Sequence, residues 1–297
     1  MKIYTNINEN IPKNCVASIG FFDGVHKGHK YILDQLQAKA QERGVEELLI
    51  SLWPHPSVLF NRPIQLLSTY QEKIDLFQTL GLQNLIFLEF NHETANMSRN
   101  EFTQKILIDR LGVSELVMGY NNSFGNKGVE QNQEIGIPVK KLDKITINNK
   151  DVNSSILRNL IKEGNVSEAE KLLGYYYQLR GKIVSGYQIG RKIGFPTGNI
   201  SEIDKMKLVP SNGVYICEVE LDSIWHPAML NIGTRPSFNG SERSIEFHIP
   251  DFEADLYDKE IKIRFRKRLR DEKKFDNIDN LIAQLNKDRE QTIKFFE

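Results

Sequence analysis

The sequence predicts two domains in one chain: an α/β domain on an open, mostly parallel sheet, and then a small antiparallel β-barrel that ends in a helix. From residue 15 to about residue 173, strand-like apolar runs alternate with amphipathic runs. After that, short strand-like runs follow one another with turn signals between them. The chain has 297 residues, 40% of them hydrophobic and 26% charged, which is enough for two ordinary domains. We expect the domains to be 1–177 and 178–297.

Short apolar runs in the first domain are typical of buried parallel strands, and the runs between them of helices. The expected strands are Cys15–Ile19, Glu47–Leu52, Asn84–Phe90 and Glu115–Gly119, and the expected helices are Lys30–Arg43, Tyr70–Leu80 and Arg99–Leu111. A glycine follows each expected helix, at positions 44, 81 and 112, where a helix can end in left-handed backbone. Ligands on such sheets bind at the carboxyl ends of the strands, so we expect the first site there.

The second domain is predicted from short strands separated by turn residues. The expected strands are Gln178–Ser185, Gly213–Leu221, Ile224–Ile232, Ser244–Ile249 and Ile261–Phe265. A final helix is indicated by apolar residues at helical spacing, namely Ile278, Leu281, Ile282 and Leu285. This pattern favours a small barrel closed by one helix.

Charge and composition exclude several classes of function. Lys plus Arg equals Asp plus Glu at 39 each, so no net field attracts nucleic acid or a membrane surface. We find no apolar run of membrane-spanning length and no signal-peptide core, and the two cysteines, Cys15 and Cys217, lie in strand-like runs as expected of free buried thiols. We therefore expect a cytoplasmic protein that acts on small molecules. The sequence leaves its oligomeric state open.

A glycine-rich turn joins the first expected strand to the first helix. It reads Gly20-Phe21-Phe22-Asp23-Gly24-Val25-His26-Lys27-Gly28-His29. The unpaired N–H groups and positive dipole end of a helix N-terminus suit a triphosphate. His26 and His29 are three residues apart, so both rings can face one side of the first turn and donate to phosphate oxygens. The alternative is a plain turn with two surface histidines, and a Zn²⁺ site lacks a third ligand at a sensible spacing.

A second anion-binding segment is indicated at Val152–Arg158. Ser154 or Ser155 is a good N-cap for a helix that runs to Lys162, and Arg158 lies one turn into it. Hydroxyl groups, a helix N-terminus and a guanidinium together can bind phosphate. Taken alone, the segment is equally consistent with an ordinary N-cap and a solvated arginine.

These segments resemble the nucleotidyltransferases with a His-x-Gly-His motif. The matching residues are Gly20, Phe22, Asp23, Gly24, His26, Gly28 and His29, followed by Ser154, Ser155 and Arg158. Trp53-Pro54-His55-Pro56 and Leu67–Lys73 look like the flavin mononucleotide (FMN) adenylyltransferase module of bifunctional riboflavin kinases. The resemblance implies a Rossmann-like fold, ATP bound by the matching residues, and catalysis by His26 and His29. We interpret His55 as structural.

One stretch departs from that family. Where the family usually has Gly-x-Asp-Phe-x-Phe-Gly, this chain has Gly119-Tyr120-Asn121-Asn122-Ser123-Phe124-Gly125. The resemblance implies that Asn121, Asn122 and Phe124 contact the flavin. Asparagine can hydrogen-bond a flavin edge, but it supplies neither the charge nor the stacking area of the usual residues.

In the barrel, a phosphate site without a Walker loop is indicated by Pro196-Thr197-Gly198-Asn199. Thr197 and Asn199 present two neutral oxygens on one side of an extended turn, which together with ATP phosphates suits Mg²⁺. Without the neighbouring sequence, these four residues would predict only a turn. On the expected strand at residues 244–249, Glu246 alternates onto a polar face with His248.

The second domain resembles riboflavin kinases over most of its length. Matching segments include Gly190–Asn199, Asn231–Phe238, Ile245–His248 and Leu269–Phe275, and Gly198 stands where alanine is usual. The resemblance implies ATP contacts from Gly186, Arg191, Thr197 and Asn199, with Mg²⁺ on the last two. It makes Glu246 the general base and places Arg270 on a loop over the flavin.

Together the resemblances imply a bifunctional enzyme. Riboflavin and ATP would give FMN at the second site, and FMN and ATP would give flavin adenine dinucleotide (FAD) at the first. Two alternatives remain: a kinase with weak or lost adenylyl transfer, favoured by Asn121-Asn122-Ser123, and a flavin-binding regulator with idle sites.

Overall fold

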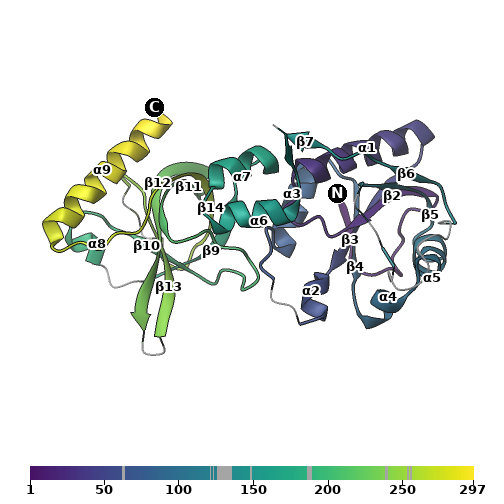
Figure 1. Cartoon of the computed structure of the whole chain (residues 1–297), viewed down its shortest axis with the longest axis horizontal. Coiled ribbons are helices and arrows are strands. Elements are labelled where there is room, and N and C mark those ends of the chain that lie inside the picture. The colour runs from purple at the N-terminus through teal and green to yellow at the C-terminus, as the bar shows by residue number, and fades with distance from the viewer. Residues whose placement is uncertain are drawn as a thin grey trace. The chain divides into compact units, whose positions relative to one another are not determined.

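The computed structural model describes residues 1–61, 64–120, 122, 124–125, 136–147, 149–185, 189–237, 240–252, 254 and 256–297. These residues form two compact units, Met1–Ser154 and Ser155–Glu297 (Figure 1). No helix in these ranges is long and apolar enough to cross a membrane. The predicted boundary at 177/178 differs from this division, and it remains a prediction about which stretch of chain works with which domain.

The first unit contains a six-stranded sheet in which every neighbouring pair is parallel. Its order is β1 (Lys2–Tyr4), β4 (Asn84–Glu89), β3 (Glu47–Trp53), β2 (Cys15–Gly20), β5 (Val113–Met118) and β6 (Val139–Lys141). Strand order reverses at β2, since β3 and β4 follow on one side and β5 and β6 on the other. The carboxyl end of β2 is therefore the topological switch point where such sheets bind ligands.

The helices of this unit are α1 (Lys27–Arg43), α2 (Pro56–Leu59), α3 (Tyr70–Thr79), α4 (His92–Asn96) and α5 (Arg99–Phe102). A π-helix, Thr103–Ile108, continues α5, and a small hairpin consists of β7 (Thr146–Ile147) and β8 (Lys150–Asp151). The four central strands and the left-handed glycines at positions 44, 81 and 112 confirm the predictions. The predictions missed β1 and β6, because short edge strands carry little pattern of their own.

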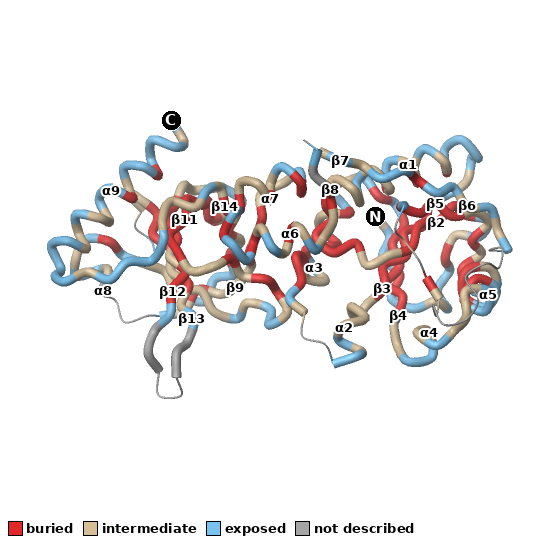
Figure 2. The backbone as a smooth tube through the Cα atoms, viewed as in Figure 1, coloured by how far each residue is buried: buried red, intermediate tan, exposed pale blue. Residues whose placement is uncertain are grey.

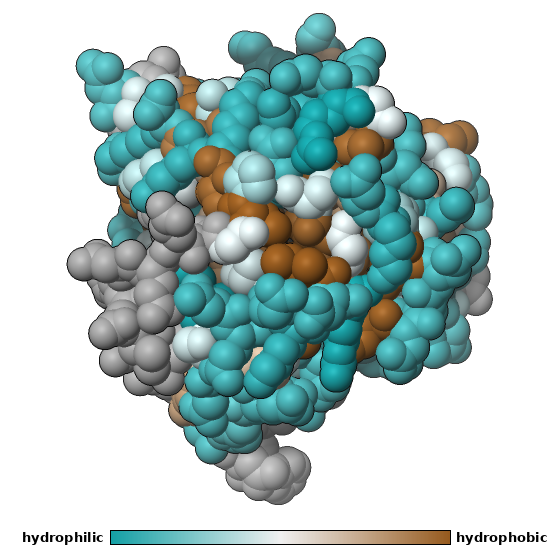
Figure 3. Space-filling model, turned by 90° about the vertical axis from the view of Figure 1, so that its right-hand side faces the viewer, coloured by the Kyte–Doolittle hydropathy of each residue, from teal (hydrophilic) through white to brown (hydrophobic). Residues whose placement is uncertain are grey.

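The sheet is buried on both faces, as expected of parallel strands (Figure 2). Alternate residues of β2 separate into two cores: Ala17 and Ile19 pack with α5 and the π-helix, whereas Val16 packs with α1 and α3. From the side of α4, α5 and β6, hydrophobic residues gather near the middle of the surface and hydrophilic ones surround them (Figure 3).

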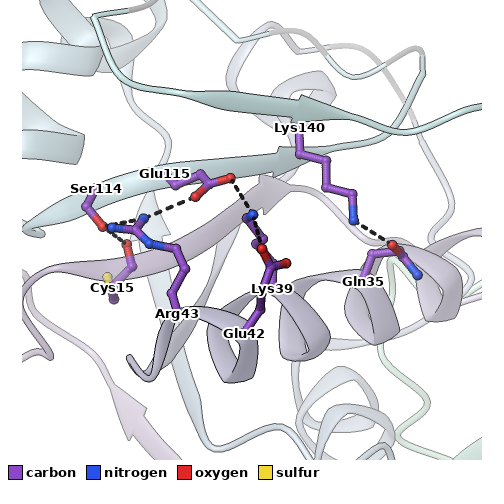
Figure 4. Close-up of polar contacts among 8 residues, drawn as sticks. All are labelled: Cys15, Gln35, Lys39, Glu42, Arg43, Ser114, Glu115 and Lys140. Carbon is purple, nitrogen blue, oxygen red and sulfur yellow. Dashed lines mark hydrogen bonds and ion pairs between the residues drawn. The ribbon is translucent and has the colours of Figure 1, made fainter.

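Polar contacts hold α1 against β5 and the edge strand β6 (Figure 4). Arg43 lies 3.1 Å from Glu115 of β5, and Lys39 lies 3.8 Å from the same carboxylate. One turn nearer the N-terminus, Lys140 of β6 donates to Gln35 at 2.8 Å. These contacts fix the direction of the helix whose first turn carries His29.

The second unit is built on a closed six-stranded barrel with antiparallel neighbours. Its order is β10 (Gly198–Ser201), β13 (Gly240–His248), β12 (Ile224–Ser237), β11 (Gly213–Leu221), β14 (Glu260–Arg270) and β9 (Gln178–Val184). Helices α6 (Ser154–Lys162), α7 (Val166–Leu173), α8 (Ile189–Lys192) and α9 (Ile278–Phe296) complete it. The barrel and the final helix confirm the prediction. We expected a turn at Gly198 and Asn199, but pairing with β9 and β13 extends them into a strand.

Residues before β9 are also part of this unit. Ser167 of α7 donates to the Arg266 carbonyl of β14 at 3.0 Å. Tyr177 is fully buried and donates to the Leu208 carbonyl at 2.6 Å. Tyr176 lies under the Arg266 guanidinium at 4.0 Å from its ring centre. The barrel therefore packs against a stretch that sequence analysis assigned to the first domain.

Candidate active sites

The turn after β2 has strained backbone that its neighbours hold in place. Phe22 and Gly24 have φ values of 48° and 80°. Such a value is costly for phenylalanine, and a Cβ at Gly24 would lie 2.8 Å from the Leu67 side chain. The buried Asp23 carboxylate accepts from the backbone N–H groups of Leu67 at 3.0 Å and Ser68 at 3.1 Å. Asp23 thus fixes the turn, and its predicted contact with ATP remains a prediction.

The two histidines lie together at the start of α1. His26 is the N-cap, and its Nδ1 accepts from the His29 N–H at 3.3 Å. The two rings stack with centres 3.6 Å apart, and the Phe22 ring meets His29 edge-on at 5.2 Å. A Cβ at Gly28 would lie 3.0 Å from the His26 ring, and one at Gly20 would lie 3.1 Å from the Phe22 ring. Both glycines therefore let aromatic rings approach the backbone.

Burial and nearby charge keep His29 neutral. Desolvation lowers its pKa well below 6.5, and the charges of His26 and Lys73 lower it further. Its Nδ1 is buried and has no hydrogen-bond partner in the part of the chain that the structure describes. A neutral imidazole with a fixed orientation can still donate one N–H to an oxygen that gains charge.

Of the predicted phosphate segment, Ser154 contacts the turn directly. Its hydroxyl donates to the Asp23 carbonyl at 2.9 Å. The expected N-cap was Ser154 or Ser155, but α6 begins at Ser154, which leaves Asn153 in the preceding position. Ser155 and Arg158 follow on α6 within the second unit, and their joint site with His26 and His29 remains a prediction.

The predicted flavin residues after β5 have structural contacts. The Asn122 side chain donates to the Ile19 carbonyl of β2, so it joins the two strand ends at the switch point. Phe124 is buried in the core, with its ring 5.5 Å from that of Phe102. Asn121 lies outside the described residues. Any flavin contact from Asn122 or Phe124 is still a prediction.

In the second unit, strand register brings the predicted kinase residues together. Asn199 of β10 is paired with Glu246 of β13, and residues opposite each other on neighbouring strands share a face. Glu246 is paired on its other side with Asn231 of β12. The Thr197 hydroxyl donates to Glu246 Oε2 at 3.4 Å. A half-buried group of hydroxyl, amide and carboxylate oxygens results.

A cavity of about 560 Å³ adjoins this group. Arg191, Thr197 and the rings of Phe247, Phe252 and Tyr257 are among the residues that line it. The cavity thus has a cation and a hydroxyl as well as aromatic walls, which suits a ligand with phosphates and a planar ring.

The loop at this cavity is closed on itself. The Phe195 N–H donates to the Gly190 carbonyl at 2.8 Å, and a Cβ at Gly190 would lie 2.2 Å from the Phe195 carbonyl oxygen. Gly190 is therefore required by close backbone approach. Gly186, predicted to contact ATP, lies outside the described residues.

The oxygens of Thr197, Asn199 and Glu246 fit a magnesium ion, which prefers hard oxygen ligands and needs few from the protein. His248 does not belong to this set. Its Nδ1 lies 2.8 Å from the Pro196 carbonyl, and burial lowers its pKa below 6.5. It therefore supports the loop as a neutral side chain.

Arg270 lies at the end of β14, not on a loop as expected. Its guanidinium donates to the carboxylate of Asp288, on α9, at 3.0 Å from Nε and 2.7 Å from Nη2. Gln284 donates to the same carboxylate at 2.9 Å. Arg270 therefore fixes α9 on the barrel, and its predicted flavin contact remains a prediction.

Two polar residues near the sites, Asn231 and Lys73, were not predicted as site residues from the sequence. Asn231 interrupts the apolar run Ala228–Ile232, which was a usable signal. Lys73 is 1% exposed and shares a helix face with Tyr70, Ile74 and Phe77 by their spacing of three and four. A charged residue on the apolar face of a helix was the signal for it.

These features define a class: a nucleotidyltransferase-type α/β domain joined to a kinase-type barrel. The family model described as FAD synthetase matches residues 8–156, and the one described as riboflavin kinase matches residues 173–296. A solved structure named "Macrolide-efflux Protein from Streptococcus pneumoniae" has a TM-score of 0.87 at 27% identity and covers 98% of both chains. Both domains and their order are therefore shared with known proteins.

Relatives named bifunctional riboflavin kinase/FMN adenylyltransferase match nearly the whole chain. The protein of Listeria monocytogenes is 32% identical over 95% of this chain and 93% of its own length. That of Bacillus subtilis is 32% identical over 95% and 92%, and that of Escherichia coli is 30% identical over 98% and 96%. The chain belongs to the family of bifunctional riboflavin kinase/FMN adenylyltransferases, and it is a transferase.

Proposed function

We propose that this chain phosphorylates riboflavin with ATP in its barrel, and that Glu246 is the base for this step. Glu246 would accept the proton of the riboflavin 5′-hydroxyl as that oxygen attacks the γ-phosphorus of ATP. The observation that carries this assignment is the contact between Thr197 and Glu246, at 3.4 Å, beside the register pair of Asn199 and Glu246. A base and oxygens that can hold Mg²⁺ are thus adjacent, and Thr197 also lines the cavity.

Thr197 and Asn199 would hold Mg²⁺ together with the ATP phosphates, and Arg191 lines the same cavity as a further cation for them. The ion neutralises phosphate charge when it is bound. Pairing with β13 fixes Asn199, and the hydrogen bond to Glu246 fixes Thr197 just before β10, so that the γ-phosphorus would meet the hydroxyl in line. Positioning and charge stabilisation are sufficient for this reaction.

The first unit adenylylates FMN with ATP to give FAD and pyrophosphate. His26 and His29 would donate to phosphate oxygens that gain charge as the FMN phosphate attacks the α-phosphorus. Support comes from the stacked rings on the first turn of α1, at the switch point of the sheet. The Asn121-Asn122 departure motivates the narrower alternative, a kinase without adenylyl transfer.

One experiment separates the candidates. The purified protein is incubated with riboflavin, Mg²⁺ and ATP, and FMN and FAD are separated by chromatography. Both products are expected. FMN alone would support the narrower kinase, and bound but unchanged riboflavin would support a flavin-binding regulator.

Two further assignments are proposals. We place the functional boundary at 177/178, immediately before the first barrel strand, β9, and a few residues after the riboflavin kinase match begins at residue 173. A cytoplasmic location is supported by Cys15 and Cys217, which are free and buried. Burial raises the pKa of the Cys15 thiol to about 11, so it is unreactive near neutral pH.

A further inference from the structure

Lys73 is a buried lysine beside the histidines of the first site. It lies in α3, which begins with a capping box in which Thr69 and Glu72 satisfy each other's backbone N–H groups. Only 1% of Lys73 is exposed. A buried ammonium is costly unless its hydrogen bonds are made, so its contacts indicate what it does.

The ammonium contacts the strained turn. Lys73 Nζ donates to the Phe21 carbonyl at 2.6 Å and lies 5.1 Å from the centre of the Trp53 ring. That carbonyl belongs to the peptide that leads into Phe22, whose φ is 48°. Such a conformation persists only where neighbours hold it. Lys73 therefore fixes the orientation of the peptide next to the left-handed residue.

The turn that contains Phe22 also positions the His29 ring. The Phe22 ring packs edge-on against the His29 ring at 5.2 Å and against Phe77, one turn of α3 after Lys73, at 6.0 Å. Lys73 thus holds the Phe22 backbone, and its own helix holds the Phe22 ring. A rotation of this peptide would move the ring that supports His29.

The charge of Lys73 also acts on His29. Burial lowers the pKa of this imidazole, and the charges of His26 from the same turn and Lys73 from α3 lower it further. An uncharged residue at position 73 would remove one of these causes, so the pKa of His29 would rise toward 6.5. This effect is separate from the hydrogen bond to Phe21.

We propose that Lys73 is a positioning residue for adenylyl transfer: its ammonium holds the Phe21–Phe22 peptide and, through the Phe22 ring, the orientation of His29. The proposal rests on the adenylyltransferase activity proposed above. It assigns to Lys73 no contact with the reacting atoms.

The test compares Lys73→Met, Lys73→Arg and a control, Lys105→Met, which removes an exposed charge from the same unit. FAD formation from FMN is measured with KM for ATP, FMN formation from riboflavin serves as an internal reference, and calorimetry follows unfolding. Lys73→Met should lower kcat for FAD on the order of 10²-fold, the usual cost of a small misplacement, with KM changed much less. Lys73→Arg should be intermediate, and the control should equal wild type.

A second measurement follows the His29 ring by NMR through a pH titration. Its pKa should rise in Lys73→Met and stay low in Lys73→Arg and Lys105→Met. Wild-type turnover in Lys73→Met would overturn the proposal, and the His29 pKa tests the separate effect of the Lys73 charge. If Lys73→Met shows no unfolding transition for the first unit, that variant is not folded and Lys73→Arg is the test instead. Wild-type turnover in Lys73→Arg would then overturn the proposal. If neither variant folds, Lys73 is a stability residue and the proposal is wrong. A wild-type protein that makes no FAD refutes the proposed function instead.

Discussion

Side chains hold the first site in place, whereas backbone pairing holds the second. In the first unit, Asp23 and Lys73 fix a turn with left-handed residues. In the barrel, Asn199 and Glu246 face each other because β10 and β13 pair in that register. Removing a side chain from the first site therefore disturbs geometry as well as chemistry. At the second site, a conservative change should remove chemistry alone.

The largest effect is expected from Glu246→Gln, which keeps the shape of the side chain and removes the base. Kinase turnover should fall by roughly 10²–10⁴. The unfolding midpoint and FAD formation from supplied FMN should stay near wild type, because the register of β13 does not depend on the carboxylate. Glu260→Gln, an exposed residue of β14, is the matched control. Near-normal FMN formation in Glu246→Gln would refute the role.

Truncation tests whether the barrel alone holds the second site. A fragment of residues 155–297 should fold and convert riboflavin to FMN. A fragment of residues 178–297 loses Tyr177, a fully buried ring, and should be less stable by about 3–5 kcal/mol. Urea unfolding of the two fragments measures the difference. Equal stabilities would show that the stretch before β9 contributes nothing to the barrel.

His29→Ala tests the histidine pair, where geometry and chemistry are coupled. Losing one well-placed donor typically costs about 2.7–4 kcal/mol, or 10²–10³ in turnover, so FAD formation should fall by that factor. KM for ATP should rise much less, because backbone N–H groups hold the ground-state charge. FMN formation should be unchanged.

The control is His92→Ala, an exposed histidine of α4. Steady-state FAD synthesis from FMN at several ATP concentrations gives both constants. If KM rises and turnover holds, the histidines bind substrate and transition state equally, and the proposed mechanism is wrong.

The sequence predicted what depends on local pattern. The buried central strands, the left-handed glycines and most barrel strands follow from apolar runs and turn residues. The resemblance to riboflavin kinases placed Thr197, Asn199 and Glu246 in one site, which stays a prediction, and pairing with β9 and β13 makes Asn199 part of a strand. Edge strands β1 and β6 consist of three residues each and form because a neighbour accepts them.

The sequence does not show the tertiary contacts that support its site residues. The Asp23 carboxylate accepts from Leu67 and Ser68, more than forty positions away, and its contact with ATP stays a prediction. Arg270 is held by Asp288 of the last helix, and its contact with the flavin stays a prediction. The sequence pattern predicts the type of residue at a site. It does not predict which distant polar groups hydrogen-bond that residue in the folded chain.

The smallest effect is expected from Gly198→Ala, which installs the residue that is usual in riboflavin kinases. Gly198 is paired with Phe247, and a Cβ there would lie 2.6 Å from two atoms of the Phe247 ring. Overpacking of this kind costs about 1–3 kcal/mol, and we expect the lower end because that ring borders the cavity and can move into it. The moved ring would narrow the cavity, so the KM of FMN synthesis should rise. The kcat of that reaction depends on Thr197 and Glu246 and should change little.

Combining Gly198→Ala with Phe247→Leu should restore both stability and this KM, since the smaller side chain leaves room for the methyl group. A double-mutant cycle by urea unfolding and FMN synthesis measures this coupling. Additive effects would mean that Phe247 does not limit the size of residue 198.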